Sequence, residues 1–466
     1  MTHPSTHPLL DPRTGIITRL DHVAAEPWWP SGLNVCTAAV SAISALLPWP
    51  ADRVATGTAF HDPDRAVLRA AGEATERYCG NFVPAGLRRA TFRELAAAGE
   101  NALDPATLAL YSASQYAEPG CPFVPFTADL PVLWIRGTTL DGPPVWVPAS
   151  LVFVNYLVPP REAEPATNYA MLAGLAAGPD LRFALTSGLE EIIERDATVI
   201  WWANRLPAAP VDLADARLAH LLRPAADLGP GWGRPHGATG DLRYRVVRIP
   251  TTFDVAVIGV LLDDPALGIH TFGVAARPDP VNAVAKALAE AVTLRIYSLG
   301  LLEPGGAIYQ AVEDGVLSQD MLKPHRPDRA YAQSYRGDFR DVVDLSCHSQ
   351  IWLDPAMAKE LAPITGETDP VRLDDLPVIT GDVRQAYLDR VRALGLDAHA
   401  VDLTTADVAA TGARVVRVVV PGAYSNPPAA FPFLGGDRLY TDPVRLGLRA
   451  VPLAEADVNL VPLPHT

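Results

Sequence analysis

Several short stretches of the chain alternate apolar and polar residues or are rich in Val, Ile and aromatic residues, which is typical of β-strands. Proline, glycine or aspartate bounds each of them. The strands expected in this way lie at residues 131–137, 145–158, 243–250, 253–262 and 413–421. Longer Ala- and Leu-rich stretches with helical spacing lie between them. We therefore expect an α+β fold, mixed throughout, in which helices pack on β-sheets.

Two segments, residues 159–167 and 223–240, carry the proline and glycine density of exposed loops. Both are long enough to form lids or to contact a peptide. The alternative, which we favour, is a plain surface insertion.

One pattern occurs three times, at residues 62–77, 180–195 and 279–295. Each copy opens with an aspartate suited to a helix N-cap, and a glutamate follows at a constant interval. The pairs are Asp62 and Glu73, Asp180 and Glu191, and Asp279 and Glu290. Each copy predicts a helix that packs by one apolar stripe. The stripes are Val67, Ala70, Ala71 and Ala74; Leu185, Gly188, Leu189 and Ile192; and Val284, Ala287, Leu288 and Ala291.

The composition is that of a globular protein. A chain of 466 residues with 49% hydrophobic residues allows roughly two to four domains and a large core. Its formal net charge of −15 argues against binding to nucleic acid or to an anionic membrane surface. The sequence shows neither a secretory signal pattern nor an apolar run of membrane-spanning length. We therefore expect a cytoplasmic protein with no nucleic-acid or membrane partner.

The cysteines and lysines exclude several common sites. The four cysteines form no CxxC pair, so neither a zinc site nor a disulfide framework is expected. The three lysines, Lys286, Lys323 and Lys359, all lie outside a Gly-Lys-Ser/Thr context. A phosphate-binding loop of that type is therefore excluded.

Two of the repeated helices carry a second glutamate and an arginine. Glu76 and Arg77 follow Glu73, and Glu194 and Arg195 follow Glu191. Carboxylates three residues apart on a helix repel each other, so a cation should compensate. Either the arginines or water do so, or glutamates from several helices bind Mg²⁺ that bridges the phosphates of a nucleotide. In the second case Arg77, Arg195 and Lys286 neutralise the remaining phosphate charge.

Several motifs together resemble one family. They include "TGIITRL", "DPDRAVLRAAGEATERY", "PVLWIRGTTLDGPPVWVPASLV", "SGLEEIIERDATVIWW", "FGVAARPDPVNAVAKALAEAVTLR", "DLSCHSQIWLDP" and "LGGDRLYTDPVRLG". In this order they resemble the YcaO family over nearly the whole chain. The resemblance implies a YcaO-type fold with ATP and Mg²⁺ bound between the repeated helices. It also implies an ATP-dependent enzyme that modifies backbone amides of a ribosomally made precursor peptide.

Carried over residue by residue, the resemblance assigns two sets of site residues. The implied metal ligands or their close support are Glu73, Glu76, Glu191, Glu194 and Glu290, and the implied phosphate-binding residues are Arg77, Arg195 and Lys286. The chain departs from the family at Phe183, where members often have another glutamate, and at Ala176, Pro179 and Thr293. Since Phe183 offers no oxygen ligand, the number of Mg²⁺ ions stays open, and Asp180 is a possible substitute.

The reaction that the resemblance favours is cyclodehydration of Cys, Ser or Thr residues to thiazoline or oxazoline. The ending "NLVPLPHT" resembles the proline-rich tail of azoline-forming members, which enters the active site, so Pro464 and Thr466 are candidate catalytic positions. An untidy surface terminus is the alternative. His348 could be a catalytic base, but we favour a structural role. Thioamide or amidine formation, and a non-catalytic scaffold, remain alternative functions.

The expected organisation has three parts: an N-terminal segment at 1–55, a YcaO domain at 56–440 and a proline-containing tail at 441–466. The resemblance also implies a separate leader-peptide-binding partner related to ubiquitin-activating proteins. We further expect a homodimer.

Overall fold

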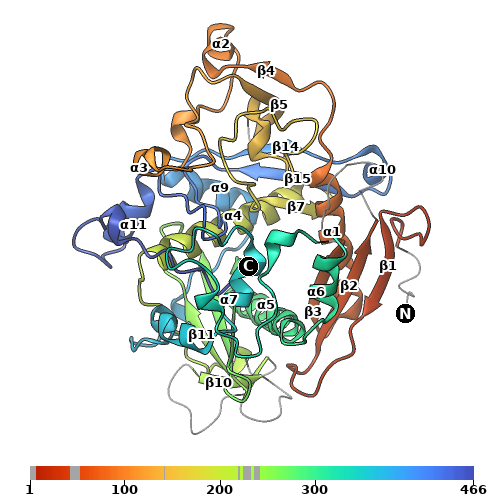
Figure 1. Cartoon of the computed structure of the whole chain (residues 1–466), viewed down its shortest axis with the longest axis vertical. Coiled ribbons are helices and arrows are strands. Elements are labelled where there is room, and N and C mark those ends of the chain that lie inside the picture. The colour runs from red at the N-terminus through yellow and green to blue at the C-terminus, as the bar shows by residue number, and fades with distance from the viewer. Residues whose placement is uncertain are drawn as a thin grey trace.

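The computed structural model describes residues 7–41, 53–140, 142–218, 221–223, 232–235, 242–315 and 317–465. Within these residues the strands form three antiparallel sheets, each packed against one long helix (Figure 1). The mixed α+β fold expected from the sequence is confirmed.

The first sheet lies near the N-terminus. Its order is β1 (Ile17–His22), β2 (Leu33–Val40) and β3 (Val54–Phe60). Helix α1 (Pro63–Asn81) packs on β2 and β3.

The second sheet joins strands from distant parts of the chain. Its order is β4 (Arg88–Ala90), β5 (Val132–Thr139), β14 (His399–Asp402), β15 (Arg414–Val419) and β7 (Leu175–Gly178), and β6 (Pro144–Pro148) pairs with β5. Helix α4 (Leu181–Ala203) packs on β15 and β7.

The third sheet has the order β13 (Ile269–Arg277), β12 (Ala256–Asp264), β11 (Arg243–Arg248), β10 (Trp232–Pro235) and β9 (Leu222–Arg223), with β8 (Ala209–Pro210) paired to β11. Helix α5 (Pro280–Leu301) packs on β13 and β12.

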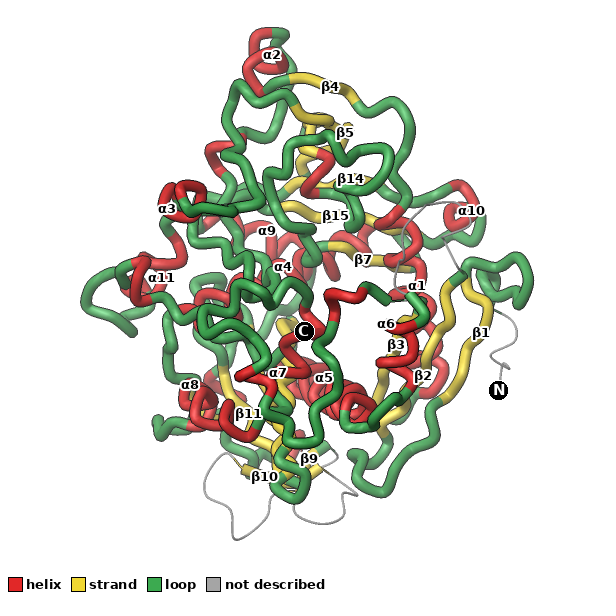
Figure 2. The backbone as a smooth tube through the Cα atoms, in the orientation of Figure 1, coloured by secondary structure: helices red, strands yellow, loops and turns green. Residues whose placement is uncertain are grey.

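Shorter helices surround the three units (Figure 2). They are α2 (Phe92–Ala97), α3 (Ala113–Ala117), α6 (Ala307–Glu313), α7 (Leu345–Ile351), α8 (Ala362–Thr365), α9 (Val383–Ala393), α10 (Ala406–Ala409) and α11 (Arg438–Arg445). Helix α7 lies near the middle of the molecule beside the C-terminus (Figure 2).

The three long helices are the three predicted repeats, and each begins at the predicted cap. The side chains of Asp62, Asp180 and Asp279 accept hydrogen bonds from backbone N–H groups three residues later, at 2.9, 2.8 and 3.0 Å. These bonds satisfy amides that have no partner within the helix. The predicted apolar stripes are buried.

Glycine lets two of the helices approach their strands closely. A Cβ at Gly57 of β3 would lie 2.1 Å from the carbonyl oxygen of Ala66 in α1, and one at Gly273 of β13 would lie 2.1 Å from that of Ala287 in α5. Any larger residue at these two positions would push the helix away from its strand, so the glycines allow the close packing from which helix side chains reach the strand backbone.

The three units are arranged in a ring. Strands β3, β7 and β13 are edge strands of their sheets. Each long helix packs on its own sheet and also contacts the edge strand of another unit: α1 contacts β7, α4 contacts β13 and α5 contacts β3. Three edge strands and three helices therefore surround one region of the molecule.

Two sequence expectations need correction. The strand expected at 145–158 ends at Pro148, where proline has no N–H for the ladder and a 3₁₀ turn follows. The loop expected at 223–240 contains Arg223, the last residue of β9, and the whole of β10, which pairs with β9; its other residues lie outside the described residues. The segment 159–167 is a loop, as expected.

The expected domain boundaries stay predictions. The one after residue 55 falls within β3, and the one after residue 440 falls within α11. Among the described helices, each is too short or too polar to cross a bilayer.

Candidate functional site

The first glutamate of each repeat reaches the edge strand of its own unit. Glu73 accepts a hydrogen bond from Thr56 N at 2.9 Å, and Glu191 accepts one from Gly174 N, just before β7, at 2.9 Å. Glu290 accepts one from Val274 N at 3.3 Å. Edge strands present N–H groups that no neighbouring strand satisfies, and here glutamates satisfy them.

The second glutamate reaches across to the next unit. Glu76 of α1 accepts from Ala177 N of β7 at 2.6 Å, and Glu194 of α4 accepts from Ala276 N of β13 at 3.2 Å. Helix α5 has Thr293 at the equivalent position, and its hydroxyl bonds to the Glu290 carbonyl instead. The two ExxER helices therefore link three units, and all five predicted glutamates lie in one region.

The predicted phosphate-binding cations pair with these glutamates. Arg77 Nη2 lies 2.6 Å from Glu73 Oε1, and Lys286 Nζ lies 2.6 Å from Glu290 Oε1. Arg195 Nε lies 3.5 Å from Glu194 Oε1. In each of these three glutamates, one carboxylate oxygen accepts a hydrogen bond from a strand and the other oxygen faces a cation. The five glutamates and three cations that the sequence predicts therefore lie in one region.

Negative charge accumulates in the site. Burial, with the like charges of Glu191 and Glu73, raises the pKa of Glu76 to about 8. Burial and the nearby Glu290 likewise raise the pKa of Glu194 to about 7. The protein cations therefore compensate Glu76 and Glu194 incompletely, whereas Lys286 and Arg195 lower the pKa of Glu290 to about 2.

Arg417, which the sequence analysis missed, lies beneath the glutamates. This arginine of β15 is fully buried and donates to the carbonyl oxygens of Val152, Leu172 and Ala173 at 2.7–2.9 Å. Its charge acts on Glu191 and Glu76, and burial lowers its pKa to about 10. Its Nη2 atom has no hydrogen-bond partner within the described part of the chain. A charged residue inside the apolar run "RVVRVVV" was the available signal.

A second missed group lies beside the site. Arg277 Nη1 is 3.3 Å from Glu190 Oε2, and Tyr387 donates to Glu190 at 3.0 Å. Arg69 of α1 is close enough for its charge to interact with Arg277 and Glu190. Two further guanidinium groups therefore adjoin the carboxylates. Their charges fit an anionic ligand.

The C-terminal tail, residues 459–465, runs along α4 and α7 at the middle of the molecule, and its residues 462–465 are buried (Figure 1). Trp202 Nε1 donates to the Val461 carbonyl at 2.7 Å, and Trp352 Nε1 donates to the Pro462 carbonyl at 3.0 Å. His348 Nδ1 lies 3.2 Å from the Leu463 carbonyl oxygen. The surface-terminus alternative is therefore wrong for these residues.

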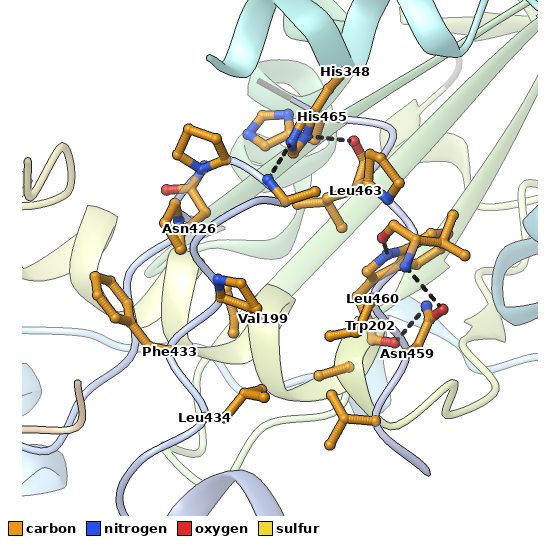
Figure 3. Close-up of a pocket in the computed structure, with 18 of the residues that line it drawn as sticks. Val199, Trp202, His348, Asn426, Phe433, Leu434, Asn459, Leu460, Leu463 and His465 are labelled. Atoms are coloured by element: carbon orange, nitrogen blue, oxygen red, sulfur yellow. Dashed lines mark hydrogen bonds between the residues drawn. The ribbon is translucent and has the colours of Figure 1, made fainter. Parts of the chain in front are cut away.

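His348 is part of this anchor. Its Nε2 accepts from Ala429 N at 3.1 Å, so its Nδ1 carries the proton that it donates to Leu463. Burial lowers its pKa to about 4. Both ring nitrogens are bound to backbone, as the structural interpretation predicted. Figure 3 shows His348 and His465 at one end of an apolar pocket, with Phe433 and Leu434 at the other.

The tail ends among the glutamates. His465 Nε2 contacts Arg195 Nη1, and ligand atoms of Glu194, Glu290 and His465 all lie within 4.8 Å of one another. Pro464 is buried, and Thr466 lies outside the described residues, so both catalytic assignments stay predictions. His465 belongs to the tail motif "NLVPLPHT", but its position in that motif predicts no role for it.

At the position where family members often have another glutamate, the structure places neither Phe183 nor Asp180 as a free metal ligand. Phe183 is 52% exposed in the first turn of α4 and supplies no ligand. The Asp180 carboxylate already caps that helix.

The donor set fits a divalent cation. Five carboxylates from three helices, three with raised pKa values, offer hard oxygen ligands in one region. The adjacent arginines and Lys286 fit phosphate oxygens. Mg²⁺ held by these carboxylates would supply positive charge to a bound phosphate group.

Comparisons with known proteins agree with this arrangement. The family model described as "YcaO cyclodehydratase, ATP- and Mg²⁺-binding" matches residues 59–424. A protein of Methanothermobacter thermautotrophicus, described as uncharacterized, is 28% identical over 299 residues, which are 62% of this chain and 64% of that protein.

Two solved structures share the fold. A heterocyclase in complex with substrate and cofactor matches with a TM-score of 0.68 and 21% identity over 98% of this chain and 56% of its own. YcaO from Methanopyrus kandleri, bound with AMPPCP and Mg²⁺, matches with a TM-score of 0.54 and 20% identity over 87% and 86%. The chain thus spans less than two thirds of the first relative and of the heterocyclase. The matched family model and the ring of glutamate-bearing helices together place this chain in the YcaO family.

Proposed function

We propose that the protein catalyses ATP- and Mg²⁺-dependent cyclodehydration of Cys, Ser or Thr residues in a ribosomally made precursor peptide. The observation that carries the proposal is the convergence of Glu73, Glu191 and Glu290 from three similarly built helices, with cations beside them. We assign the metal to Glu73, Glu76, Glu191, Glu194 and Glu290, and the nucleotide phosphates to Arg77, Arg195 and Lys286.

The proposed chemistry activates an amide oxygen. The substrate thiol or hydroxyl loses its proton to solvent as it attacks the preceding carbonyl carbon, and the carbonyl oxygen takes the γ-phosphoryl group of ATP as ADP leaves. Phosphate then departs with the oxygen, and loss of the nitrogen proton forms the C=N bond of the azoline. The peptide loses one water in total. The amide oxygen is a poor leaving group, and phosphorylation makes it a good one.

The protein's own contribution is alignment and charge neutralisation. Arg195 and Lys286 lie next to carboxylates, so they are held within reach of a triphosphate bound between α4 and α5. The buried position of Arg417 adds a fixed positive charge below Glu191 and Glu76. Groups fixed in this way stabilise developing charge without rearranging during the reaction.

The anchored tail supports ring formation over the alternatives. Three ring N–H groups hold consecutive carbonyls of residues 461–463, which fits a proline-containing tail that shapes the site. We keep Pro464 and Thr466 as candidate positions near the reacting amide. Thioamide or amidine formation would use the same phosphorylation with external sulfide or an internal amine as nucleophile.

We propose that leader-peptide binding comes from outside the residues described above. The chain matches 56% of the length of the heterocyclase solved with substrate. Functions located in the rest of that protein would come from a partner, for example one related to ubiquitin-activating proteins, or from further sequence. A homodimer remains our expectation for the assembly.

Mass spectrometry of a precursor peptide encoded beside this gene tests the proposal. Incubation with ATP and Mg²⁺ should remove one water for each ring formed, and Glu73→Gln should abolish the change. Exchange of oxygen for sulfur would establish thioamidation instead. An unchanged peptide, with protein that also fails to bind nucleotide, would support the non-catalytic scaffold.

A further inference from the structure

The tail places a nitrogen ligand among carboxylates that the proposed function treats as an all-oxygen metal site. His465 is 3% exposed. Its ring lies between the Phe272 carbonyl oxygen of β13, 3.1 Å from Nδ1, and the guanidinium group of Arg195, which contacts Nε2. Since a carbonyl can only accept, Nδ1 carries the proton and Nε2 presents a lone pair.

This arrangement is typical of metal-binding histidines, in which the other ring N–H donates to a backbone carbonyl and fixes the ring. Here the Phe272 carbonyl holds the proton on Nδ1, and the Arg195 guanidinium donates to Nε2, so the Nε2 lone pair points into the site.

The Nε2 atom faces two carboxylates. Ligand atoms of Glu194, Glu290 and His465 lie within 4.8 Å of one another. Around an octahedral ion with bonds of about 2.1 Å, ligand atoms lie about 3 to 4 Å apart. Small side-chain movements would bring the three atoms to that spacing.

We propose that Glu194, Glu290 and His465 Nε2 bind one divalent cation, and that the nitrogen ligand makes this position prefer a first-row transition metal such as Fe²⁺ or Zn²⁺ to Mg²⁺. Imidazole nitrogen suits transition metals, whereas Mg²⁺ prefers oxygen. This inference rests on the proposed function, since it concerns the same nucleotide site.

Arg195 sets a condition on this site. One lone pair cannot accept from Arg195 and bind a metal at the same time. The guanidinium must turn away from Nε2 before the ion binds, and nucleotide phosphates would attract it. Metal binding at His465 should therefore be measured with a nucleotide analogue present.

Electron paramagnetic resonance of Mn²⁺ bound with AMPPCP tests the proposal directly, because a coordinated imidazole gives a ¹⁴N coupling in the electron spin-echo modulation. We expect the coupling in the wild-type chain and in His22→Ala, a change at an exposed histidine. It should disappear in His465→Ala and His465→Gln, and their Mn²⁺ affinity should fall by about tenfold or more. Selective ¹⁵N labelling of histidine in the wild-type chain should also alter the signal, which needs no variant to fold.

Absence of ¹⁴N coupling in wild-type protein saturated with Mn²⁺ and AMPPCP, or its persistence in His465→Ala, would overturn the inference. Calorimetric titration of the same samples with AMPPCP and Mg²⁺ separates failure of the histidine ligand from failure of the proposed nucleotide site. Normal magnesium-dependent binding without the coupling rejects only the histidine ligand, whereas no nucleotide binding at all rejects the proposed function as well.

Discussion

Helix α4 carries two buried ionic clusters within two turns, and they differ in how their charges are satisfied. In the first, Asp196 is fully buried and receives two hydrogen bonds from Arg438, at 2.7 and 2.8 Å. Arg438 also donates to Asp442 at 2.7 Å, and Thr252 donates to the same carboxylate at 2.8 Å. Protein groups therefore satisfy this cluster.

The second cluster, around Glu191 and Glu194, is held more loosely. Glu194 has one backbone bond of 3.2 Å and an arginine contact of 3.5 Å. Burial raises the pKa of both Glu194 and Asp196, so the two clusters differ in the number and length of their hydrogen bonds. A buried ion pair closed by short bonds therefore serves stability, whereas carboxylates with few protein partners can bind a cation.

Breaking the first cluster, formed by Asp196, Arg438 and Asp442, should have the largest effect on stability. Arg438→Met leaves Asp196 and Asp442 buried without their cation, so we expect the free energy of unfolding to fall by about 3–5 kcal/mol in urea denaturation. Arg445→Met is the matched control, because Arg445 contacts Asp442 from a 57% exposed position at 3.5 Å. If both variants lost a similar free energy of unfolding, the buried pairs of Arg438 would not be the source of the stability.

Changing the second cluster, around Glu191 and Glu194, should affect activity more than stability. Glu191→Gln keeps an oxygen for Gly174 N but removes the charge, so turnover should fall by about 100-fold or more. The free energy of unfolding should change by less than about 1 kcal/mol, within the usual range for a tolerated substitution. Glu313→Gln, at an exposed position on α6, should leave both unchanged. Wild-type turnover in Glu191→Gln would refute the site.

The raised pKa values predict a pH dependence of stability. The folded pKa of Glu76, about 8, lies above the unfolded value near 4.5. The folded state therefore holds more protons in this interval, and the stabilisation present below about pH 4.5 is lost as pH rises towards about 8. We expect a slope of about 1 kcal/mol per pH unit or less in metal-free denaturation. Glu76→Gln should reduce the slope, and an equal slope in that variant would contradict the assignment.

The smallest effect belongs to the exposed start of α4. Arg182 Nη2 lies 2.9 Å from Asp382 Oδ1, with side chains 66% and 46% exposed. Because water screens this pair, Arg182→Ala should lower the free energy of unfolding by about 0.5 kcal/mol or less, measured by the same denaturation. If the free energy of unfolding fell by more than about 1 kcal/mol, solvent exposure would not explain why the ionic groups of α4 differ in their contribution to stability.

The repeated helices were predictable because local chemistry determines them. An aspartate cap, an apolar stripe and a glutamate at a fixed interval identified α1, α4 and α5. The bonds from Glu76 to β7 and from Glu194 to β13 were not predictable, because they depend on how separate sheets meet. Arg417 was missed for the same reason: a strand pattern does not reveal what lies against it.

The strand expected at 145–158 shows a different limit. An apolar run is compatible with a strand or with a buried 3₁₀ turn, and Pro148 decides between them. The role of His465 could not be found from spacing either, since the tail meets Arg195 only in the folded chain, 270 positions apart.

Calorimetric titration with AMPPCP, with and without Mg²⁺, tests most directly whether the glutamates of three helices form one nucleotide site. We predict magnesium-dependent binding to the wild-type chain and to Glu313→Gln, and its loss in Glu191→Gln while that variant stays folded. Binding that ignores Mg²⁺, or wild-type affinity in Glu191→Gln, would contradict the account.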